Sequence, residues 1–228
     1  MTRVYEGIVL RQTKTMGGRR MVLIFTREAG KISAGTFISE KSKSGSALAI
    51  RPFSYGQFTV SEKGQDFRTV TAAETLDAFF GLGEDVDRFS EASFVLEFSD
   101  KLLPDGVSEP GVFDLLKEYL AILSRRKGDF RLLTIAYMIK VMKGLGLFPD
   151  AGSLKSEDLL SGLNDDILSI VVFIEGQPLK RMESLRLETE KENAVFEAIR
   201  GFAQKHLDLG AIKSESMLAG RKQDLMLH

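Results

Sequence analysis

The hydrophobic period of the chain changes once along its length, and this change constrains the fold more than any other feature. In the first third, apolar residues alternate with others, as in Val4 to Arg11 and Lys31 to Ile38. A period of two is typical of strands with one buried face. From Glu84 onward, apolar residues return every three or four positions, which indicates amphipathic helices. The chain is therefore predicted to be α+β, with strands first and helices after them.

Five short strands are expected in the first third of the chain, separated by glycine-bearing turns. The runs lie within residues 4–11, 21–26, 31–38, 53–60 and 67–72. The parity of the apolar residues shifts across Gly56, as it does at a β-bulge. Five strands in so short a stretch fit a closed barrel better than an open sheet, because closure removes exposed edges. We predict a five-stranded OB-fold β-barrel, a nucleic-acid-binding domain, over residues 1–78.

Residues 79–228 are expected to form an α-helical bundle. One stripe follows the helical i, i+3, i+4, i+7 spacing: Val112, Leu115, Leu116, Tyr119, Leu120 and Leu123. Ser108 is the residue expected to cap the start of that helix. Helical spacing also marks residues 92–103, 130–141 and 195–206. The segment Gly81-Leu82-Gly83 is expected to be a short linker between the two domains.

Few residues of this chain are suited to covalent chemistry. There is no cysteine, there are only two histidines, and neither a Walker A nor a GxGxxG element is present. Nucleophilic triads, zinc–thiolate sites and nucleotide-binding loops are therefore disfavoured. Carboxylates at 165–166 and 188–192 suit helix N-termini, where negative charge is stabilised. We predict no catalytic residues and no enzyme activity; a magnesium-dependent nuclease built from these carboxylates is the enzymatic alternative.

The expected location is the cytoplasm. No apolar run approaches the ~20 residues that a membrane-spanning helix needs, and the first residues lack the apolar core of a signal peptide. The absence of cysteine also suits a reducing compartment.

The charge is distributed unevenly along the chain. Residues 1–75 hold 12 Lys/Arg and 6 Asp/Glu, a net charge of +6, whereas the remaining residues hold 19 and 26, a net charge of −7. A basic half joined to an acidic half suggests that the first half meets a polyanion.

OB-folds bind single strands through a charged groove and aromatic faces on which bases stack. The candidate basic contacts lie in or beside the turns of the barrel: Lys14, Arg19, Arg20, Arg27, Lys31, Lys41, Lys43 and Arg51. The candidate aromatic faces are Phe37, Phe53 and Tyr55, although most aromatic residues of a small barrel belong to its core.

The order of these residues resembles the RecO family of DNA repair proteins. The likeness covers both halves of the chain. It rests on Glu6-Gly-Ile-Val-Leu-Arg11, Val22-Leu-Ile-Phe-Thr26, Arg27-Glu-Ala-Gly-Lys-Ile32, Lys41-Ser-Lys-Ser44, Leu48, Pro52-Phe53, Leu145-Gly-Leu-Phe-Pro149 and Ile212-Lys-Ser214.

The chain also departs from the family pattern. Many members carry four zinc-binding cysteines after the segment matched by Phe148-Pro149, and this chain has none. No zinc or other cofactor is therefore expected, and a polar loop at 149–164 would replace the zinc-binding region. Thr36 to Glu40 is less basic than the family's segment, which shifts the expected DNA contacts to Lys41 and Lys43.

The resemblance implies a non-enzymatic recombination mediator, nucleoid-associated, that uses no nucleotide. Such proteins bind single- and double-stranded DNA, anneal complementary strands and assist RecA loading together with RecR. They also bind the acidic, apolar tail of single-strand binding protein. Candidate basic residues for a partner in the acidic half are Arg125, Arg126, Lys140 and Lys143. The alternative is a protein-interaction scaffold whose barrel binds a peptide and no DNA.

Overall fold

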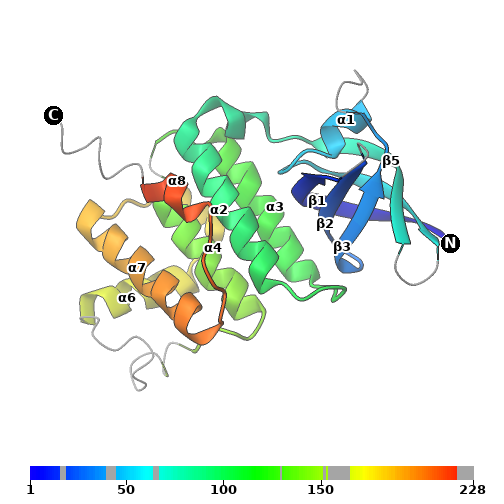
Figure 1. The fold of residues 1–228 in the computed structure, drawn as a ribbon. Helices are drawn as coiled ribbons and strands as arrows, with labels where there is room; N and C mark the ends of the chain where they lie inside the picture. Colours follow the sequence, from blue (N-terminus) through cyan, green and yellow to red (C-terminus); the bar gives the residue numbers. More distant parts are fainter. Residues whose placement is uncertain are drawn as a thin grey trace. The chain divides into compact units, whose positions relative to one another are not determined.

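A computed structural model describes residues 1–15, 19–39, 45–63, 67–128, 130–150, 153 and 165–219 (Figure 1). The chain divides into two compact units. The first joins Met1–Phe80 to Leu103–Lys117, and the second joins Gly81–Leu102 to Glu118–His228. The segment 103–117 therefore belongs with the strands, a grouping that the hydrophobic period does not predict.

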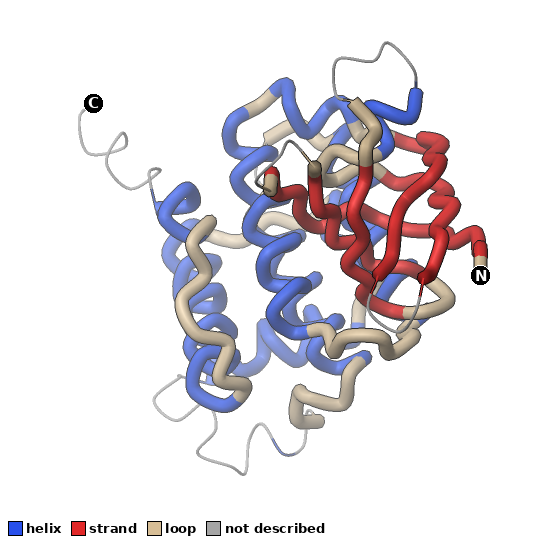
Figure 2. Tube along the Cα trace, turned by 45° about the vertical axis from the view of Figure 1, so that its right-hand side comes forward, coloured by secondary structure: helices blue, strands red, loops and turns tan. Residues whose placement is uncertain are grey.

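The strands of the first unit form a closed barrel in the order β1-β2-β3-β5-β4, and they are drawn together in red in Figure 2. Their bounds are β1 (Thr2–Lys14), β2 (Arg20–Thr26), β3 (Gly30–Thr36), β4 (Tyr55–Lys63) and β5 (Phe67–Asp77). A short helix, α1 (Gly45–Ala49), precedes β4. Every pairing is antiparallel except β3–β5, which is parallel. The predicted five-stranded OB-fold barrel is confirmed.

Gly56 marks a bulge, as the parity shift predicts. The register of β4 against β5 changes between Tyr55 and Gly56. A Cβ atom on Gly56 would lie 2.2 Å from the carbonyl oxygen of Glu74. Only glycine lets the two strands approach this closely, so the bulge is fixed by the absence of a side chain.

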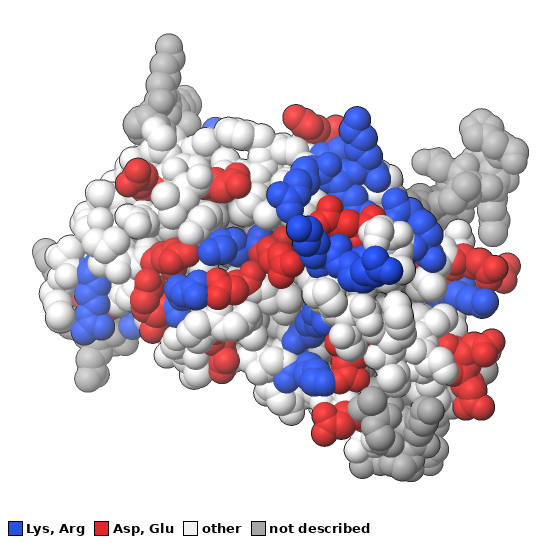
Figure 3. All heavy atoms as spheres, turned by 180° about the vertical axis from the view of Figure 1, so that it is seen from behind, with Lys and Arg blue, Asp and Glu red and all other residues white. Residues whose placement is uncertain are grey.

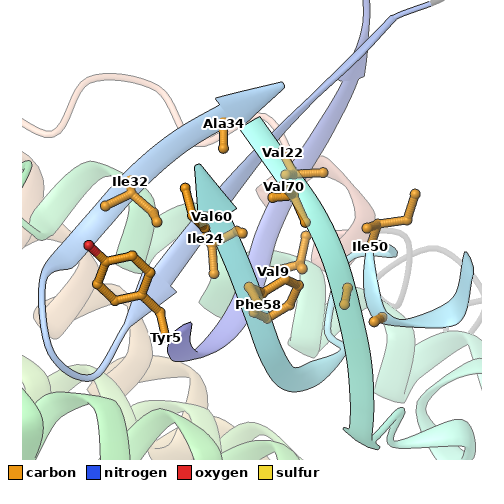
Figure 4. Packing of buried hydrophobic residues seen from close by; sticks show 12 residues of the cluster. Tyr5, Val9, Val22, Ile24, Ile32, Ala34, Ile50, Phe58, Val60 and Val70 are labelled. Carbon is orange, nitrogen blue, oxygen red and sulfur yellow. The ribbon is translucent and has the colours of Figure 1, made fainter. Parts of the chain in front are cut away.

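The core of the barrel follows from the alternation of apolar residues (Figure 4). Ile24 and Phe58 have no exposed surface, and Val9 packs in the same cluster. Burying each such side chain contributes about 1.5–3 kcal/mol. On β2, β3 and β4 the members of this cluster share one parity. Some residues of the other parity are buried as well: Phe25 has no exposed surface, and its ring packs against that of Phe113.

Helical elements follow the barrel, which confirms the predicted class of strands followed by helices. Their bounds are η1 (Phe80–Glu84), α2 (Val86–Leu102), α3 (Pro110–Arg125), α4 (Arg131–Gly144), α6 (Asp165–Gly176), η3 (Leu179–Glu183), α7 (Thr189–His206) and α8 (Glu215–Ala219). Within the described residues, no helix is both long and apolar enough to cross a membrane.

One local prediction is wrong. Ser108 does not take the N-cap position of α3, because the helix begins at Pro110, and the Ser108 hydroxyl donates to the carbonyl oxygen of Arg27 at 2.9 Å. The segment Gly81-Leu82-Gly83 lies at the division between the two units, where it forms part of η1 with Leu82 buried. The Arg88 guanidinium donates through Nη1 to the carbonyl oxygens of Gly81 and Ser124, at 2.7 and 2.9 Å. These bonds join η1 to the end of α3.

The C-terminal part of the second unit is held on α2 by a carboxylate. Glu97 accepts hydrogen bonds from the backbone N–H groups of Lys213 (2.8 Å) and Ser214 (2.9 Å) and from the Ser214 hydroxyl (2.7 Å). The ammonium group of Lys101, one turn further along α2, donates to the carbonyl oxygen of Leu209 at 3.0 Å. The segment before α8 is therefore fixed by side chains of one helix.

Gly81→Ala is expected to destabilise the helical unit. The added Cβ would lie 1.9 Å from the carbonyl oxygen of Ser124, a backbone atom that cannot move aside cheaply. We expect a loss of about 1–3 kcal/mol of unfolding free energy, as for other overpacked sites, measured by urea denaturation. Gly83→Ala is the matched control in the same short helix, since nothing lies within 4 Å of its Cβ position. Equal losses in the two variants would contradict this account.

Glu97→Gln is expected to destabilise the protein in a pH-dependent way. Burial raises the pKa of the Glu97 carboxyl, but the bonds from Ser214 and Lys213 outweigh it and hold the pKa below its ordinary value of 4.5. This stabilisation is therefore complete above pH 4.5 and is lost as the pH falls through the lower, folded-state pKa. Urea denaturation should show a difference between wild type and Glu97→Gln at pH 7 that shrinks in more acidic solution. A difference independent of pH would refute this role for the carboxylate.

Candidate nucleic-acid interface

A hollow of about 590 Å³ lies on the outer surface of the barrel, at the junction of β3 and β5. Its lining comes from the residue before β2, the end of β3 and the outer faces of β4 and β5: Arg19, Phe37, Ser61, Phe67, Thr69 and Thr71. This described lining has one cation, two aromatic rings and three hydroxyl groups, and it includes no carboxylate. Such a surface suits an anionic ligand with flat apolar parts.

The two phenylalanines of the hollow are unusually exposed. Phe37 is 78% exposed and Phe67 is 68% exposed. On β5, Phe67 shares its parity with Thr69 and Thr71, whereas Val70 points into the core. The strand geometry therefore forces the Phe67 ring outward. Large apolar side chains that stand in solvent beside a cation are typical of stacking surfaces for single strands.

Arg19 connects the two sides of the hollow. Its Nη2 donates to the hydroxyl of Thr69 on β5 at 3.2 Å. Its Cζ lies over the ring of Phe37, 5.3 Å from the centroid, which is a cation–π contact. The guanidinium and the Phe37 ring therefore form one stacked pair at the edge of the hollow.

Other predicted cations stand at the surface of the barrel. Lys14 and Arg51 are exposed, and Arg20 is half-buried. Lys14 and Arg20 are directly opposite each other in the β1–β2 ladder, and Arg20 follows Arg19 in the chain. Lys41 and Lys43 lie outside the described residues, so their predicted contacts are not tested. The roles of all these residues in DNA binding stay predictions.

Two of the predicted cations are engaged within the first unit. The Arg27 guanidinium makes a two-pronged ion pair with Asp114, and its Nη2–Oδ2 distance is 2.7 Å. Hydrogen bonds from Arg27 hold the pKa of the Asp114 carboxyl below its usual value. Lys31 is 9% exposed, and its Nζ lies 3.2 Å from Asp105. Both pairs tie segment 103–117 to the turn between β2 and β3, which gives Arg27 and Lys31 a structural role.

Tyr55, a predicted stacking face, is half-buried in the same region. Its ring lies 6.3 Å from that of Phe113, and the Lys117 ammonium lies 5.1 Å from its centroid. Its hydroxyl donates to Glu6 at 2.6 Å. Burial first, and then this bond to a carboxylate, raise the pKa of Tyr55 to about 12. The ring is therefore occupied by contacts of its own unit.

Phe53, the other predicted face, is half-buried and has a backbone conformation that is rare for a side-chain-bearing residue, with φ of +73°. Its N–H donates to the carbonyl oxygen of Val9 at 3.0 Å. It does not line the hollow described above. Its stacking role stays a prediction that the geometry does not favour.

The sequence pattern identified Phe37 as a candidate stacking ring but not Phe67. The signal for Phe67 is the alternation along β5, where its side chain lies on the same face as those of Thr69 and Thr71 and opposite to that of Val70. An aromatic residue on the polar parity of a barrel strand is a candidate for an exposed stacking ring.

The residues predicted to bind a partner fall into two groups. Arg125 is exposed, while Arg126 is buried and donates through Nη1 to the carbonyl oxygen of Met182 at 2.7 Å. Lys140 donates to the carbonyl oxygen of Glu175 at 3.1 Å, and Lys143 pairs with the Glu175 carboxylate. The two lysines therefore contact the C-terminal end of α6, where cations are favourable.

A separate apolar hollow of about 220 Å³ lies in the helical unit. It is lined by residues of α4, α6 and the segment after η3: Leu132, Ser169, Ile170, Phe173, Ile174, Leu185, Arg186 and Leu187. Phe173 is 48% exposed there. Four exposed cations, Arg125, Lys127, Lys180 and Arg181, belong to the two segments that the Arg126–Met182 bond joins. Figure 3 shows Lys and Arg side chains gathered on the rear face in the region of the helices.

The zinc site of many family members does not fit this chain. A four-thiolate site needs cysteines, and the sequence has none. Most of the segment 149–164 is outside the described residues. Elsewhere in the described chain, no three His, Asp or Glu side chains gather as metal ligands, so the nuclease alternative has no carboxylate cluster there to rest on.

Comparison with known protein families gives two matches. Residues 1–79 match the model described as "Recombination protein O N terminal", and residues 83–153 match the model described as "Recombination protein O C terminal". The two matches follow each other in the order of the barrel and the helices. Together they cover well over half of the chain.

Curated relatives agree with these matches. The DNA repair protein RecO of Alkaliphilus metalliredigens is 33% identical over 144 residues, which is 63% of this chain and 58% of that protein. The RecO protein of Pelotomaculum thermopropionicum is 27% identical and covers 89% of this chain and 88% of its own length. That of Bacillus cereus strain B4264 is 31% identical over 63% of this chain and 57% of its own length. The match thus spans less than two thirds of the Alkaliphilus and Bacillus proteins.

The barrel matches the N-terminal family model, and the helices after it match the C-terminal one. The relatives compared above are all named DNA repair protein RecO. The chain therefore belongs to the RecO family of DNA repair proteins.

Proposed function

We propose that the protein binds single-stranded DNA at the hollow between β3 and β5, without catalysing a reaction. The observation that carries the proposal is the pair of exposed rings, Phe37 and Phe67, which line one hollow together with Arg19. Unpaired bases stack on the rings, because every base has an apolar face and stacking contributes about 1–3 kcal/mol per base. Lys14, Arg20 and Arg51 contact phosphates, and Arg19 orients the Phe37 ring.

Binding of this kind is largely independent of base sequence. Phosphate contacts position the strand, and stacking does not read the edges of bases. If about four phosphates are neutralised, the log–log salt slope should be near −3 for single strands. Lys41 and Lys43, predicted contacts from the sequence, would add to that slope.

The wider activity follows from the family resemblance. We propose that the bound strand is presented for annealing to its complement and that the protein acts with RecR in loading RecA. A strand held by its backbone and by a few stacked bases leaves its other bases available for pairing. These steps are proposals for this chain, because the matched stretch covers only part of two of the three relatives compared above.

A second proposal concerns the apolar hollow of the helical unit. Its apolar lining and the neighbouring cations suit an acidic peptide with apolar residues at its end, such as the tail of single-strand binding protein. Arg125 and Arg186 are the candidate contacts for its charges. Arg126 holds the chain in place, and Lys140 and Lys143 already contact α6.

The double variant Phe37→Ala/Phe67→Ala is expected to bind single strands at least tenfold more weakly than wild type, because two stacking faces are lost. Fluorescence anisotropy of a labelled oligothymidine measures the affinity, and 2-aminopurine in the strand reports the loss of stacking. Phe80→Ala is the matched control, since Phe80 is 70% exposed and belongs to the same unit outside the hollow. Unchanged affinity in the double variant would contradict the proposal. Binding of peptides but not of DNA by wild type would favour the scaffold alternative.

The double variant Phe173→Ala/Arg186→Ala is expected to bind the C-terminal ten residues of a bacterial single-strand binding protein about tenfold more weakly, because it removes an apolar wall and a charge. Anisotropy of the labelled peptide measures this affinity. Lys143→Ala is the control, because that lysine pairs with Glu175 and does not line the hollow. A larger loss in Lys143→Ala than in the double variant would move the site to the α4–α6 surface.

A further inference from the structure

Because Gly35 on β3 has no side chain, the guanidinium of Arg19 can lie against the backbone of this strand. A Cβ atom on Gly35 would be 2.4 Å from Nη2, 2.5 Å from Nε and 2.7 Å from Cζ of Arg19. The guanidinium therefore rests against the backbone of β3, in the volume that any other residue would fill with its side chain. Positive φ is not the reason for glycine here, because Gly35 is not among the residues with that conformation.

Arg19 is consequently held on three sides. The backbone at Gly35 supports it, the Thr69 hydroxyl accepts from its Nη2, and the ring of Phe37 lies beneath its Cζ. Its Nε is buried and has no hydrogen-bond partner in the described structure. A buried donor without an acceptor is unfavourable, so packing against Gly35 and Phe37 and the bond to Thr69 must offset this cost.

Phe37 depends on that support, since 78% of its surface is exposed. With Arg19 stacked on one face of the ring, the opposite face remains available to a base. A ring that is already oriented binds more tightly than one that must be ordered on binding. Duplex DNA gains nothing from the ring, because its bases are paired and stacked inside the helix.

We infer that Gly35 is a specificity-determining residue: by seating Arg19 against Phe37, it makes the hollow prefer single strands over duplex DNA. The inference rests on the proposed single-strand binding at this hollow. Gly35 acts through Arg19 and is a positioning residue that itself touches no DNA.

The test is Gly35→Ala, which displaces the Arg19 guanidinium. The atoms that the new Cβ meets are the far end of a flexible side chain, so Arg19 can swing away while β3 keeps its pairing with Met21 and Thr69. The charge of Arg19 is retained. We therefore expect single-strand affinity to fall about three- to tenfold, with the salt slope, the duplex affinity and the melting temperature unchanged.

Anisotropy with oligothymidine and with a duplex of equal length gives the two affinities, and quenching of 2-aminopurine reports stacking. Gly45→Ala is the matched control in the same unit, because nothing lies within 4 Å of its Cβ position. It should bind both DNAs as wild type does.

Arg19→Ala and the double variant Gly35→Ala/Arg19→Ala complete a double-mutant cycle with Gly35→Ala. The two should bind single strands equally, because Gly35 has no effect once Arg19 is absent. If Gly35→Ala binds single strands as wild type does while Phe37→Ala/Phe67→Ala does not, the inference fails and the proposed function stands. A parallel loss of single-strand and duplex affinity, or a further loss in the double variant, also overturns the inference. If the phenylalanine variant binds normally, the proposed function itself fails.

Discussion

A five-stranded barrel closes only where its two remaining edges meet, and here β3 and β5 pair at two positions, Gly35–Thr69 and Thr36–Val70. This two-residue parallel seam carries the sheet from β4 and β5 onto β3, since Ser61 pairs with Thr69 and Thr69 pairs with Gly35. The hollow lies on the outer face of this seam, where Gly35 has no side chain and the rings of Phe37 and Phe67 are exposed to solvent.

The net charge of the first 75 residues overstates how basic the surface of the barrel is. The surplus of +6 in residues 1–75 suggests a broadly basic surface, but two acids from segment 103–117 neutralise part of it. Asp105 pairs with Lys31, and Asp114 pairs with Arg27. Other basic residues of the barrel, Lys14, Arg19 and Arg20, lie at the β1–β2 end, and Arg19 lines the hollow. The basic residues thus serve two purposes, holding the segment on the barrel and presenting charge at the seam, and only position in the fold separates them.

Most of the fold could be predicted from the sequence because hydrophobic period and turn residues are local signals. The five strands, the bulge at Gly56 and the helices all follow from them. The site was harder to predict. Parity places Phe37 outside and would also have identified Phe67, whereas Arg27 and Tyr55 looked available because their partners, Asp114 and Phe113, lie more than 50 residues away in the chain. Residues placed by distant partners give no signal in the pattern around them.

A DNA repair protein that acts on single strands must distinguish them from a large excess of duplex, and phosphate contacts cannot do this. Duplex DNA has the higher charge density, so a surface of cations alone favours duplex. Discrimination has to come from groups that bind bases only when they are unpaired. In the proposed site those groups are the exposed rings at the seam, and backbone features surround them: the end of the β3–β5 pairing and the missing side chain of Gly35. Under the proposed function, affinity and selectivity are therefore separable, because the cations at the β1–β2 end would supply the affinity and the shape of the seam would supply the selectivity.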